Sequence, residues 1–273
     1  MDKKTIIITG ASDGIGACAA RVLHSQGARV VIVGRSREKT KAIADELGVD
    51  SFTADYADLS QVRRLAGELL QRYEQIDVLV NNTGMTWNDR TLTKDGHEIT
   101  FQVNHLATFL LTNLLKDRLV TSKASIIITS SVGHNYGKVN LDDLESEKKY
   151  TAMNAYCTSK LENILFMKEL HRRWSKLGIS TAAFHPGNIA SSFGRDAKGF
   201  IYYLYNSPMK HLFLSSPEKG ADTLVWLAGG EPGRDWVSGE YYVKRKAKRP
   251  KKDALDPVLA SRLWDISEQT TGI

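Results

Sequence analysis

The sequence has few cysteines and no long apolar stretch. Two of its 273 residues are cysteine, Cys18 and Cys157, and they show neither the spacing of a zinc site nor the number that a disulfide framework needs. The opening residues, MDKKTIIITG, pass directly from charge into a short β-branched stretch. Because that stretch is too short for a signal-peptide core or a transmembrane helix, we expect a soluble cytoplasmic protein in a reducing compartment.

Internal repeats and Pro/Gly/Ser-rich linkers are also missing. Hydrophobic residues make up 42% of the chain and charged residues 25%, which is the composition of an ordinary globular protein. Since α/β domains of this length are routinely undivided, we expect residues 1–273 to form a single dinucleotide-binding and catalytic domain.

Positive charge exceeds negative charge, and the formal net charge is +6. Much of the excess lies in KRKAKRPKK, residues 244–252. A block of like charges is typical of a solvated or disordered loop, and contact with an acidic partner is the alternative. Nucleic-acid binding is therefore kept only as an alternative function, recognisable by a steep loss of affinity with salt.

Short β-branched segments alternate with segments of helical periodicity along the chain. This alternation predicts an α/β fold in which crossover helices cover both faces of a parallel sheet. The expected strands are Thr5–Thr9, Arg29–Val33, Ser51–Ala54, Ile76–Asn81, Ser125–Thr129, Ile179–Phe184 and Glu240–Val243. The expected helices are Ile15–Ser25, Arg37–Leu47, Leu59–Tyr73, Thr93–Leu119 and Ala155–Leu177.

The first strand leads into a glycine-rich loop, TGASDGIG, residues 9–16. Gly10 permits a tight turn, Gly14 lets a pyrophosphate approach the backbone, and Gly16 lets the next helix pack closely on the strand. The N-terminus of that helix also offers free amides to a phosphate. We expect a dinucleotide on this loop, with Ser12, Asp13 and Ile15 among its other contacts.

The end of the second strand indicates which dinucleotide binds. An NAD enzyme places an acid there to hold the ribose 2′-hydroxyl, but this chain has Gly34 followed by Arg35. The Arg35 guanidinium, with Ser36 and Arg37 nearby, can neutralise a 2′-phosphate. Asp13 would repel that phosphate if it pointed inward, whereas an outward Asp13 would suit a helix start. We predict NADP (NADPH) as the cofactor.

Tyr156 and Lys160 are one turn apart on the same face of a predicted helix. A phenol with a pKa of about 10 is a poor acid or base at neutral pH unless an ammonium group stabilises the phenolate. The spacing alone is weak evidence, because Tyr242 and Lys246 repeat it. Tyr156 differs in following a strand that ends at Ser130 and Ser131, and a hydroxyl there could orient a substrate oxygen. We predict an oxidoreductase in which Tyr156 and Lys160 handle the proton that accompanies hydride transfer.

Several motifs in order resemble the short-chain dehydrogenase/reductase family over nearly the whole chain. They are TGASDGIG, NNTG (residues 81–84), Asn104, Ser131, Tyr156-x-x-x-Lys160 and His185-Pro186-Gly187. The resemblance implies a Rossmann-type, seven-stranded, mostly parallel sheet of order 3-2-1-4-5-6-7. It also implies a catalytic tetrad: Tyr156 as acid/base, Lys160 lowering its pKa and holding the nicotinamide ribose, Ser131 orienting the carbonyl, and Asn104 anchoring a relay water.

The same resemblance adds cofactor contacts. Asp55 matches the family's adenine-contacting acid, and Asn82, Thr83 and Gly84 match a cofactor-contacting turn in which Ala is commoner than Thr83. After the sixth strand, Pro186, Ile189 and Ser191 match the loop that holds the carboxamide, with Ser191 where Thr is usual.

Part of the chain is similar to the retinol dehydrogenase-like branch of the family. The similarity rests on the 25-residue separation of Ser131 and Tyr156 and on the fragments NHLATFLLTNLL, AYCTSKLENILF and LWDISE. The branch implies a small hydrophobic carbonyl or alcohol substrate, under a lid at about residues 190–217. The aromatic segment 199–214 fits such a lid, or alternatively a core or oligomer-interface helix. A homodimer or homotetramer is compatible with the sequence, and the membrane segment of animal members is not expected.

Two further alternatives remain open from the sequence. A catalytically weak NADP-binding regulatory or scaffold protein would have a broken tetrad, which this chain does not. Nucleotide-sugar epimerases share the Tyr-Lys pair but have another glycine spacing. His134, His185 and His211 could carry protons, but they show no metal-like spacing, and we expect them to be structural or surface residues.

Overall fold

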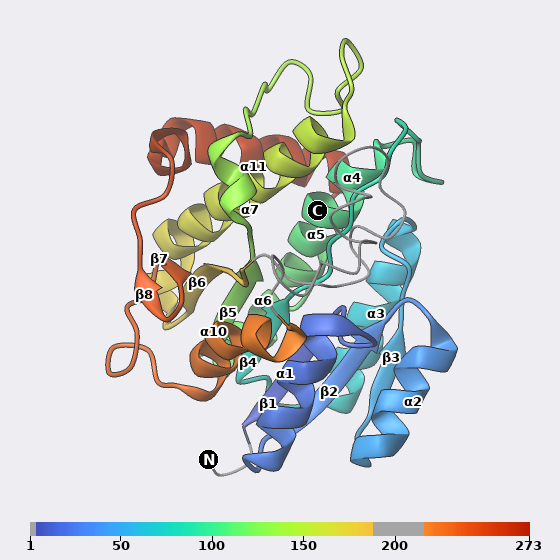
Figure 1. Cartoon of the computed structure of the whole chain (residues 1–273), viewed down its shortest axis with the longest axis vertical. Helices are drawn as coiled ribbons and strands as arrows, with labels where there is room; N and C mark the ends of the chain where they lie inside the picture. Colours follow the sequence, from blue (N-terminus) through green and yellow to red (C-terminus); the bar gives the residue numbers. More distant parts are fainter. Residues whose placement is uncertain (1–3, 188–215) are drawn as a thin grey trace.

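The computed structural model describes residues 4–187 and 216–273, and these form one eight-stranded sheet with helices on both faces (Figure 1). The strands follow the order β3-β2-β1-β4-β5-β6-β7-β8. β1 to β7 pair in parallel, and β8 pairs antiparallel with β7. The strands are β1 Thr5–Thr9, β2 Arg29–Gly34, β3 Ser51–Thr53, β4 Val78–Asn81, β5 Ser125–Thr129, β6 Ser180–His185, β7 Glu240–Val243 and β8 Lys246–Ala247. The predicted order is therefore confirmed, with one further edge strand.

Alternate residues of the buried strands feed two separate hydrophobic clusters, one on each face. In β1, Ile6 and Ile8 lie in the cluster with α1 and α10, whereas Ile7 lies in the cluster with α3, α5, α7 and α11. This division follows from the two-residue period of a strand, which explains why a sheet covered on both faces has continuous apolar strands. The main helices are α1 Gly14–Ser25, α2 Arg37–Leu47, α3 Leu59–Arg72, α5 Ala107–Leu114, α6 Lys116–Thr121, α7 Ala152–Trp174, α10 Pro217–Gly229 and α11 Pro257–Thr271.

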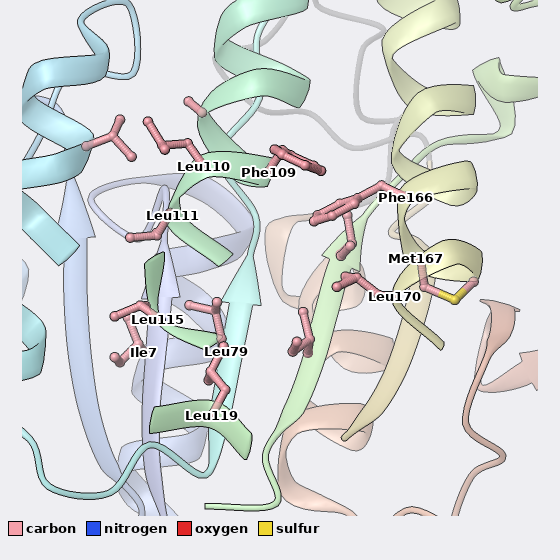
Figure 2. Close-up of a cluster of buried hydrophobic side chains, with 14 of the residues drawn as sticks. Ile7, Leu79, Phe109, Leu110, Leu111, Leu115, Leu119, Phe166, Met167 and Leu170 are labelled. Atoms are coloured by element: carbon pink, nitrogen blue, oxygen red, sulfur yellow. The ribbon is translucent and has the colours of Figure 1, made fainter. Parts of the chain in front are cut away.

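The larger cluster holds α7, the helix of Tyr156 and Lys160, firmly against the sheet and α5. Figure 2 shows Phe109 of α5 facing Phe166 of α7, and their ring centroids lie 5.3 Å apart. Trp264 of α11 packs edge-on against Phe109 at 4.9 Å. Because close-packed aromatic side chains bury large areas, this cluster fixes the position of α7 and of the polar residues on its other face.

The predicted helix Thr93–Leu119 is wrong at its start and in its continuity. Residues 93–97 form a turn in which Thr93 Oγ1 accepts the amides of Asp95 and His97. Helix α4, Ile99–Phe101, begins only after Glu98, whose carboxylate caps the amides of Thr100 and Phe101. A π-helical turn, Gln102–Leu106, then leads into α5, and α6 follows as a separate helix. The side-chain caps outcompete the helical pattern of apolar residues.

Part of the basic run 244–252 forms a solvent-exposed hairpin at the sheet edge rather than a disordered loop. Lys244 and Arg245 both have positive φ values, as a tight two-residue hairpin turn requires. Lys246 and Ala247 then form β8 along β7. Charged side chains on an edge strand discourage pairing with another chain, which gives part of the basic run a structural reason.

Three sequence predictions fall on residues outside the described ranges: Ile189, Ser191, and the lid segment up to residue 215, which includes His211. Across residues 4–187 and 216–273, no helix has the length and apolar character to cross a membrane. The same residues contain no group of three His, Cys, Asp or Glu side chains that could bind a metal ion.

Candidate active site

A cavity of about 910 Å³ opens at the carboxyl ends of the central strands. The strand order reverses between β1 and β4, and ligands of doubly wound sheets bind at such a reversal. Of the predicted site residues, these line the cavity: Gly10, Ser12, Asp13, Gly14, Ile15, Gly16, Arg35, Asp55, Asn82, Thr83, Gly84, Ser131, Tyr156, Lys160 and Pro186. Asn104 is fully buried behind the wall.

The glycine loop has the geometry that only glycine adopts readily. Gly10 and Gly14 have φ values of 63° and 54°, in the left-handed region. A Cβ atom on Gly16 would lie 2.4 Å from the carbonyl oxygen of Gly10, so any side chain there would push the first turn of α1 off the loop. The first amides of that helix, which have no partner within it, border the cavity and could bind phosphate oxygens.

Asp13 lines the cavity, but its carboxylate is already engaged by the start of α1 and by Lys39. Its carboxylate caps α1 by accepting the Gly14 amide at 2.7 Å and lies 3.4 Å from the Lys39 ammonium. Asp13 is therefore partly neutralised by the helix end and by Lys39. Arg35 and Lys39 line the cavity beside it, whereas Arg37 does not.

Gly34 leaves no room for the acid that an NAD enzyme places there. A Cβ atom at this position would lie 2.3 Å from Thr40 Oγ1 and 2.8 Å from Ser12 Cβ. Contacts this short would require the glycine loop or the start of α2 to move. The position is thus built for a bare backbone.

Asn82 joins the glycine loop to the adjacent strand ends. Its Nδ2 donates to the carbonyls of Thr9 and Gly10, and its Oδ1 accepts from Thr129 Oγ1. Thr9 Oγ1 in turn accepts the amides of Asn82 and Thr83. These bonds tie β1, β4 and β5 together at the cavity floor, so Asn82 is fixed before any ligand binds.

Asn104 lies in the π-helical turn, a feature that is frequent at functional sites. Its Oδ1 accepts the Met85 amide at 2.8 Å, and its Nδ2 donates to the Met85 carbonyl and to Ser159 Oγ. A Cβ atom on Gly84 would lie 2.8 Å from Lys160 Nζ and 3.4 Å from Asn104 Oδ1. Asn104 and Lys160 therefore lie on either side of the space that a side chain at position 84 would occupy.

Lys160 is held inside the protein next to Tyr156. Its side chain is 3% exposed, its Nζ donates to the Thr129 carbonyl at 3.3 Å, and the ammonium lies 5.5 Å from the Tyr156 ring centroid. Burial lowers the pKa of Lys160 to about 8, because loss of water disfavours the charged form. An ammonium beside a phenol in so dry a setting interacts with it strongly.

The two serines that follow β5 have different partners. Ser130 Oγ donates to the Lys160 carbonyl at 2.7 Å and is buried. Ser131 Oγ accepts the Gly133 amide at 3.1 Å, which leaves its own proton available for a substrate oxygen. A Cβ atom on Gly133 would lie 3.4 Å from Ser131 Oγ and 3.5 Å from Tyr156 Cε1, so Ser131 and Tyr156 flank the same glycine.

The second Tyr-x-x-x-Lys pair lies away from the cavity. The Tyr242 hydroxyl accepts the Val237 amide at 2.7 Å and donates to its carbonyl at 2.9 Å. Lys246 follows in β8 on the sheet edge. Neither residue lines the cavity.

The sequence reasoning missed an apolar rim of the cavity. Met85, Val132, Tyr136 and Met153 line it together, and Tyr136 is 81% exposed. Val132 and Met153 are also exposed large hydrophobic residues. Their nearness to Ser131 and Tyr156 in the chain was the available signal, but no periodic pattern marks a loop residue as facing a ligand.

Comparisons with known proteins agree with this geometry. The family model for short chain dehydrogenase matches residues 4–198. A protein of Streptomyces sp. (strain C5) named "Putative daunorubicin C-13 ketoreductase DnrU" is 41% identical, over 98% of this chain and 93% of its own. Human retinol dehydrogenase 13 is 38% identical, over 99% of this chain and 85% of its own.

A solved structure of an uncharacterized Mycobacterium paratuberculosis protein is also similar. It has a TM-score of 0.79 and 31% identity, over 99% of this chain and 94% of its own. The chain belongs to the short-chain dehydrogenase family, oxidoreductases acting on CH–OH or C=O groups, and within it to the retinol dehydrogenase-like branch.

Proposed function

We propose that this protein is an NADP-dependent oxidoreductase that interconverts a hydrophobic carbonyl compound and its alcohol. One observation carries the proposal: Ser131, Tyr156 and Lys160 line the same cavity as the glycine loop. A carbonyl bound there would meet a hydroxyl donor and a phenol with a buried ammonium beside it. A nicotinamide ring bound in the cavity would supply or remove the hydride.

The side chains of the protein would manage the proton. In the reducing direction, Tyr156 donates its phenolic proton to the substrate oxygen while the Ser131 hydroxyl holds that oxygen in place. The Lys160 ammonium stabilises the phenolate that Tyr156 becomes, and the low solvent access of Lys160 strengthens this interaction. Asn104, fixed by Met85 and Ser159, would keep the turn after β4 in register with Lys160.

The cavity walls fit a nicotinamide dinucleotide with a 2′-phosphate. The glycines at positions 10, 14 and 16 make a cradle that a Cβ atom would fill or strain, as close approach of a pyrophosphate requires. Arg35 and Lys39 supply positive charge where Gly34 excludes an acid. Asp55 and the turn at Asn82 to Gly84 would contact the adenosine and ribose parts, as in other family members.

The apolar rim supports a hydrophobic substrate. Val132, Tyr136 and Met153 offer apolar and aromatic surface at the cavity mouth, and side chains of these kinds line most small-molecule pockets. The names of two relatives, a putative daunorubicin C-13 ketoreductase and a retinol dehydrogenase, refer to bulky molecules with large apolar parts. We infer a substrate of that general kind.

The cofactor choice is tested by replacing Arg35 and Arg37 with alanine, one at a time. Arg35→Ala should weaken NADPH binding by about 10- to 100-fold, because it removes charge-assisted hydrogen bonds to the 2′-phosphate. NADH binding should change little. Arg37→Ala removes the same charge from an exposed residue that does not line the cavity and is the matched control. Wild-type protein that binds NADH as tightly as NADPH in a fluorescence titration would refute the assignment.

The reaction is tested by following NADPH absorbance with all-trans-retinal, daunorubicin and a set of aromatic aldehydes and ketones. We expect the wild type to reduce at least one bulky apolar carbonyl. Ser131→Ala should reduce the same compound much more slowly than the wild type. Tight NADPH binding without turnover of any of these compounds would favour the alternative, a cofactor-binding regulatory or scaffold protein.

A further inference from the structure

We infer that His134 is a positioning residue for Ser131, and that the segment after β8 holds it in place through Lys251. The inference rests on the proposed function, because it concerns the hydroxyl that would orient the substrate oxygen. It assigns roles to His134 and Lys251 that could not be predicted from the sequence. His134 has no metal-like spacing, and Lys251 lies in the basic run.

His134 is bonded to the residue that it would position. Its Nδ1 lies 2.6 Å from the Ser131 carbonyl oxygen, and its backbone amide donates to the same oxygen at 3.1 Å. The Ser131 side chain accepts the Gly133 amide. The carbonyl and the hydroxyl of Ser131 are thus both held by residues of one short 3-10 turn, Val132–Asn135.

The other side of the imidazole contacts the C-terminal part of the chain. Nε2 lies 3.3 Å from the Lys251 amide. Because a carbonyl oxygen can only accept, Nδ1 must carry the ring proton, which leaves Nε2 as the acceptor for that amide. The two bonds therefore require the neutral Nδ1–H tautomer. Burial lowers the pKa of His134, which keeps the ring neutral at physiological pH.

Two further contacts make the arrangement rigid. The His134 ring is 2% exposed and packs edge-on against Tyr241 of β7, with centroids 4.9 Å apart. The Lys251 ammonium donates to the Gly137 carbonyl at 2.8 Å. A Cβ atom on Gly137 would lie 2.3 Å from the Cys157 carbonyl oxygen, so Gly137 rests on α7 directly beside Tyr156.

Lys251 therefore contacts the loop between Ser131 and α7 at two points, His134 and Gly137. Ser131 lies at one end of this loop, and its other end packs on α7 next to Tyr156. A small shift of either end changes the distance from the Ser131 hydroxyl to the Tyr156 hydroxyl. Misplacement of such groups by about 1 Å can slow an enzyme by about 10²-fold.

The decisive experiment is a double-mutant cycle with His134→Phe and Ser131→Ala, using NADPH and whichever carbonyl of the screen the wild type reduces. Phe keeps the ring packing on Tyr241 but removes both nitrogen contacts. We expect His134→Phe to lower kcat by about 10- to 100-fold with NADPH affinity unchanged. In the Ser131→Ala background it should cause no further loss, because its effect passes through Ser131.

An equal loss in both backgrounds would overturn the inference, since His134 would then act on general structure. Full turnover in Ser131→Ala would overturn both the proposed role of Ser131 and this inference. The Ser131→Ala variant measured alone shows whether this is the case. His134→Asn, which retains a donor near the Ser131 carbonyl, should recover part of the lost kcat.

A second route changes the backbone instead of the ring. Lys251→Pro removes the amide that His134 accepts and the ammonium that binds Gly137, and the φ value of Lys251, −50°, is one that proline adopts. Lys251→Ala removes the ammonium alone. We expect the proline variant to lower kcat more than the alanine variant, with exposed Lys252→Ala as the unaffected control. Equal effects of Pro and Ala would contradict the role of the amide.

The tautomer can be measured without turnover. Long-range proton–nitrogen NMR of the histidine-labelled wild-type protein should show His134 as the Nδ1–H form. Detection of the Nε2–H form would overturn the positioning role while leaving the proposed function intact.

Discussion

Lys160 carries its charge in a part of the protein with almost no access to water. The side chain is 3% exposed, and its hydrogen bond is to the Thr129 carbonyl. Such a group costs folding free energy while it is charged. The residue is therefore better explained by chemistry at Tyr156 than by stability.

We expect Lys160→Met to abolish turnover and to stabilise the cofactor-free protein at pH 7. Burial lowers the pKa of Lys160 to about 8 from 10.5, so between these values the folded protein has released a proton that the unfolded chain still holds. Wild-type stability should thus rise with pH in this window, by up to about 3 kcal/mol relative to the variant. Urea denaturation from pH 7 to 10 measures the difference, and a difference independent of pH would contradict the prediction.

The two Tyr-x-x-x-Lys pairs allow a matched comparison at single hydroxyl groups. Tyr156→Phe should reduce kcat by about 10²- to 10⁴-fold, because it removes the proton donor. Tyr242→Phe should leave kcat unchanged and lower the free energy of unfolding by about 1–2 kcal/mol, since it leaves backbone groups of Val237 unpaired. Full turnover in Tyr156→Phe would disprove the proposed mechanism.

At the scale of the helix, α7 holds two buried glutamates in opposite electrostatic settings. Glu169 is bonded to Arg172 and Arg173. Glu162 is 1% exposed, and among the described residues neither of its oxygens has a hydrogen-bond partner. Burial, with repulsion from Glu98 and Glu145, raises the pKa of Glu162 well above its usual value. For Glu169, burial opposes ionisation, but the arginine hydrogen bonds outweigh it and lower the pKa.

Glu162→Gln and Glu169→Gln should therefore change the stability of the protein in opposite directions. Because the pKa of Glu162 in the folded protein is raised above the 4.5 of the unfolded chain, the folded protein keeps a proton that the unfolded chain has lost, and wild-type stability falls as pH rises beyond 4.5. Glu162→Gln should match the wild type near pH 4.5 and be more stable at pH 8, by about 1–3 kcal/mol.

Glu169→Gln should instead destabilise the protein at pH 8, because it removes a charge that two arginines require. Chemical denaturation at the two pH values tests both variants. Loss of stability at pH 8 in Glu162→Gln would show that Glu162 is ionised and paired in solution.

At the scale of the whole molecule, cofactor binding should stabilise the fold. The cavity is built from the ends of several strands and from α1 and α7, so a ligand that bridges them opposes unfolding of the entire sheet. NADPH at 100 times its Kd should add about 2.7 kcal/mol, or roughly 5–10 °C in Tm for a protein of this size. NADH at the same concentration should give a smaller shift, and the two shifts should become similar in Arg35→Ala.

Local pattern was sufficient for much of the framework. The predicted bounds of β1, β5, β7 and α2 agree with the structure residue for residue, because buried β-branched runs and a capped amphipathic helix carry their own signals. α10 was not predicted. Its interior Gly220 weakens the helical pattern, and its stability comes from packing Leu224 and Leu227 against α1, which a local pattern cannot reveal.

The sequence by itself determined the α/β class, the family, the glycine loop and the candidate Tyr156–Lys160 pair, because each depends on short local motifs and on their order along the chain. Tertiary structure decided that Ser130 binds the Lys160 carbonyl, that Asp13 faces Lys39, and that Lys251 reaches His134 across 117 residues. These outcomes depend on where strands and loops meet in space. Spacing along the chain sets which groups are available, and only packing determines which of them touch.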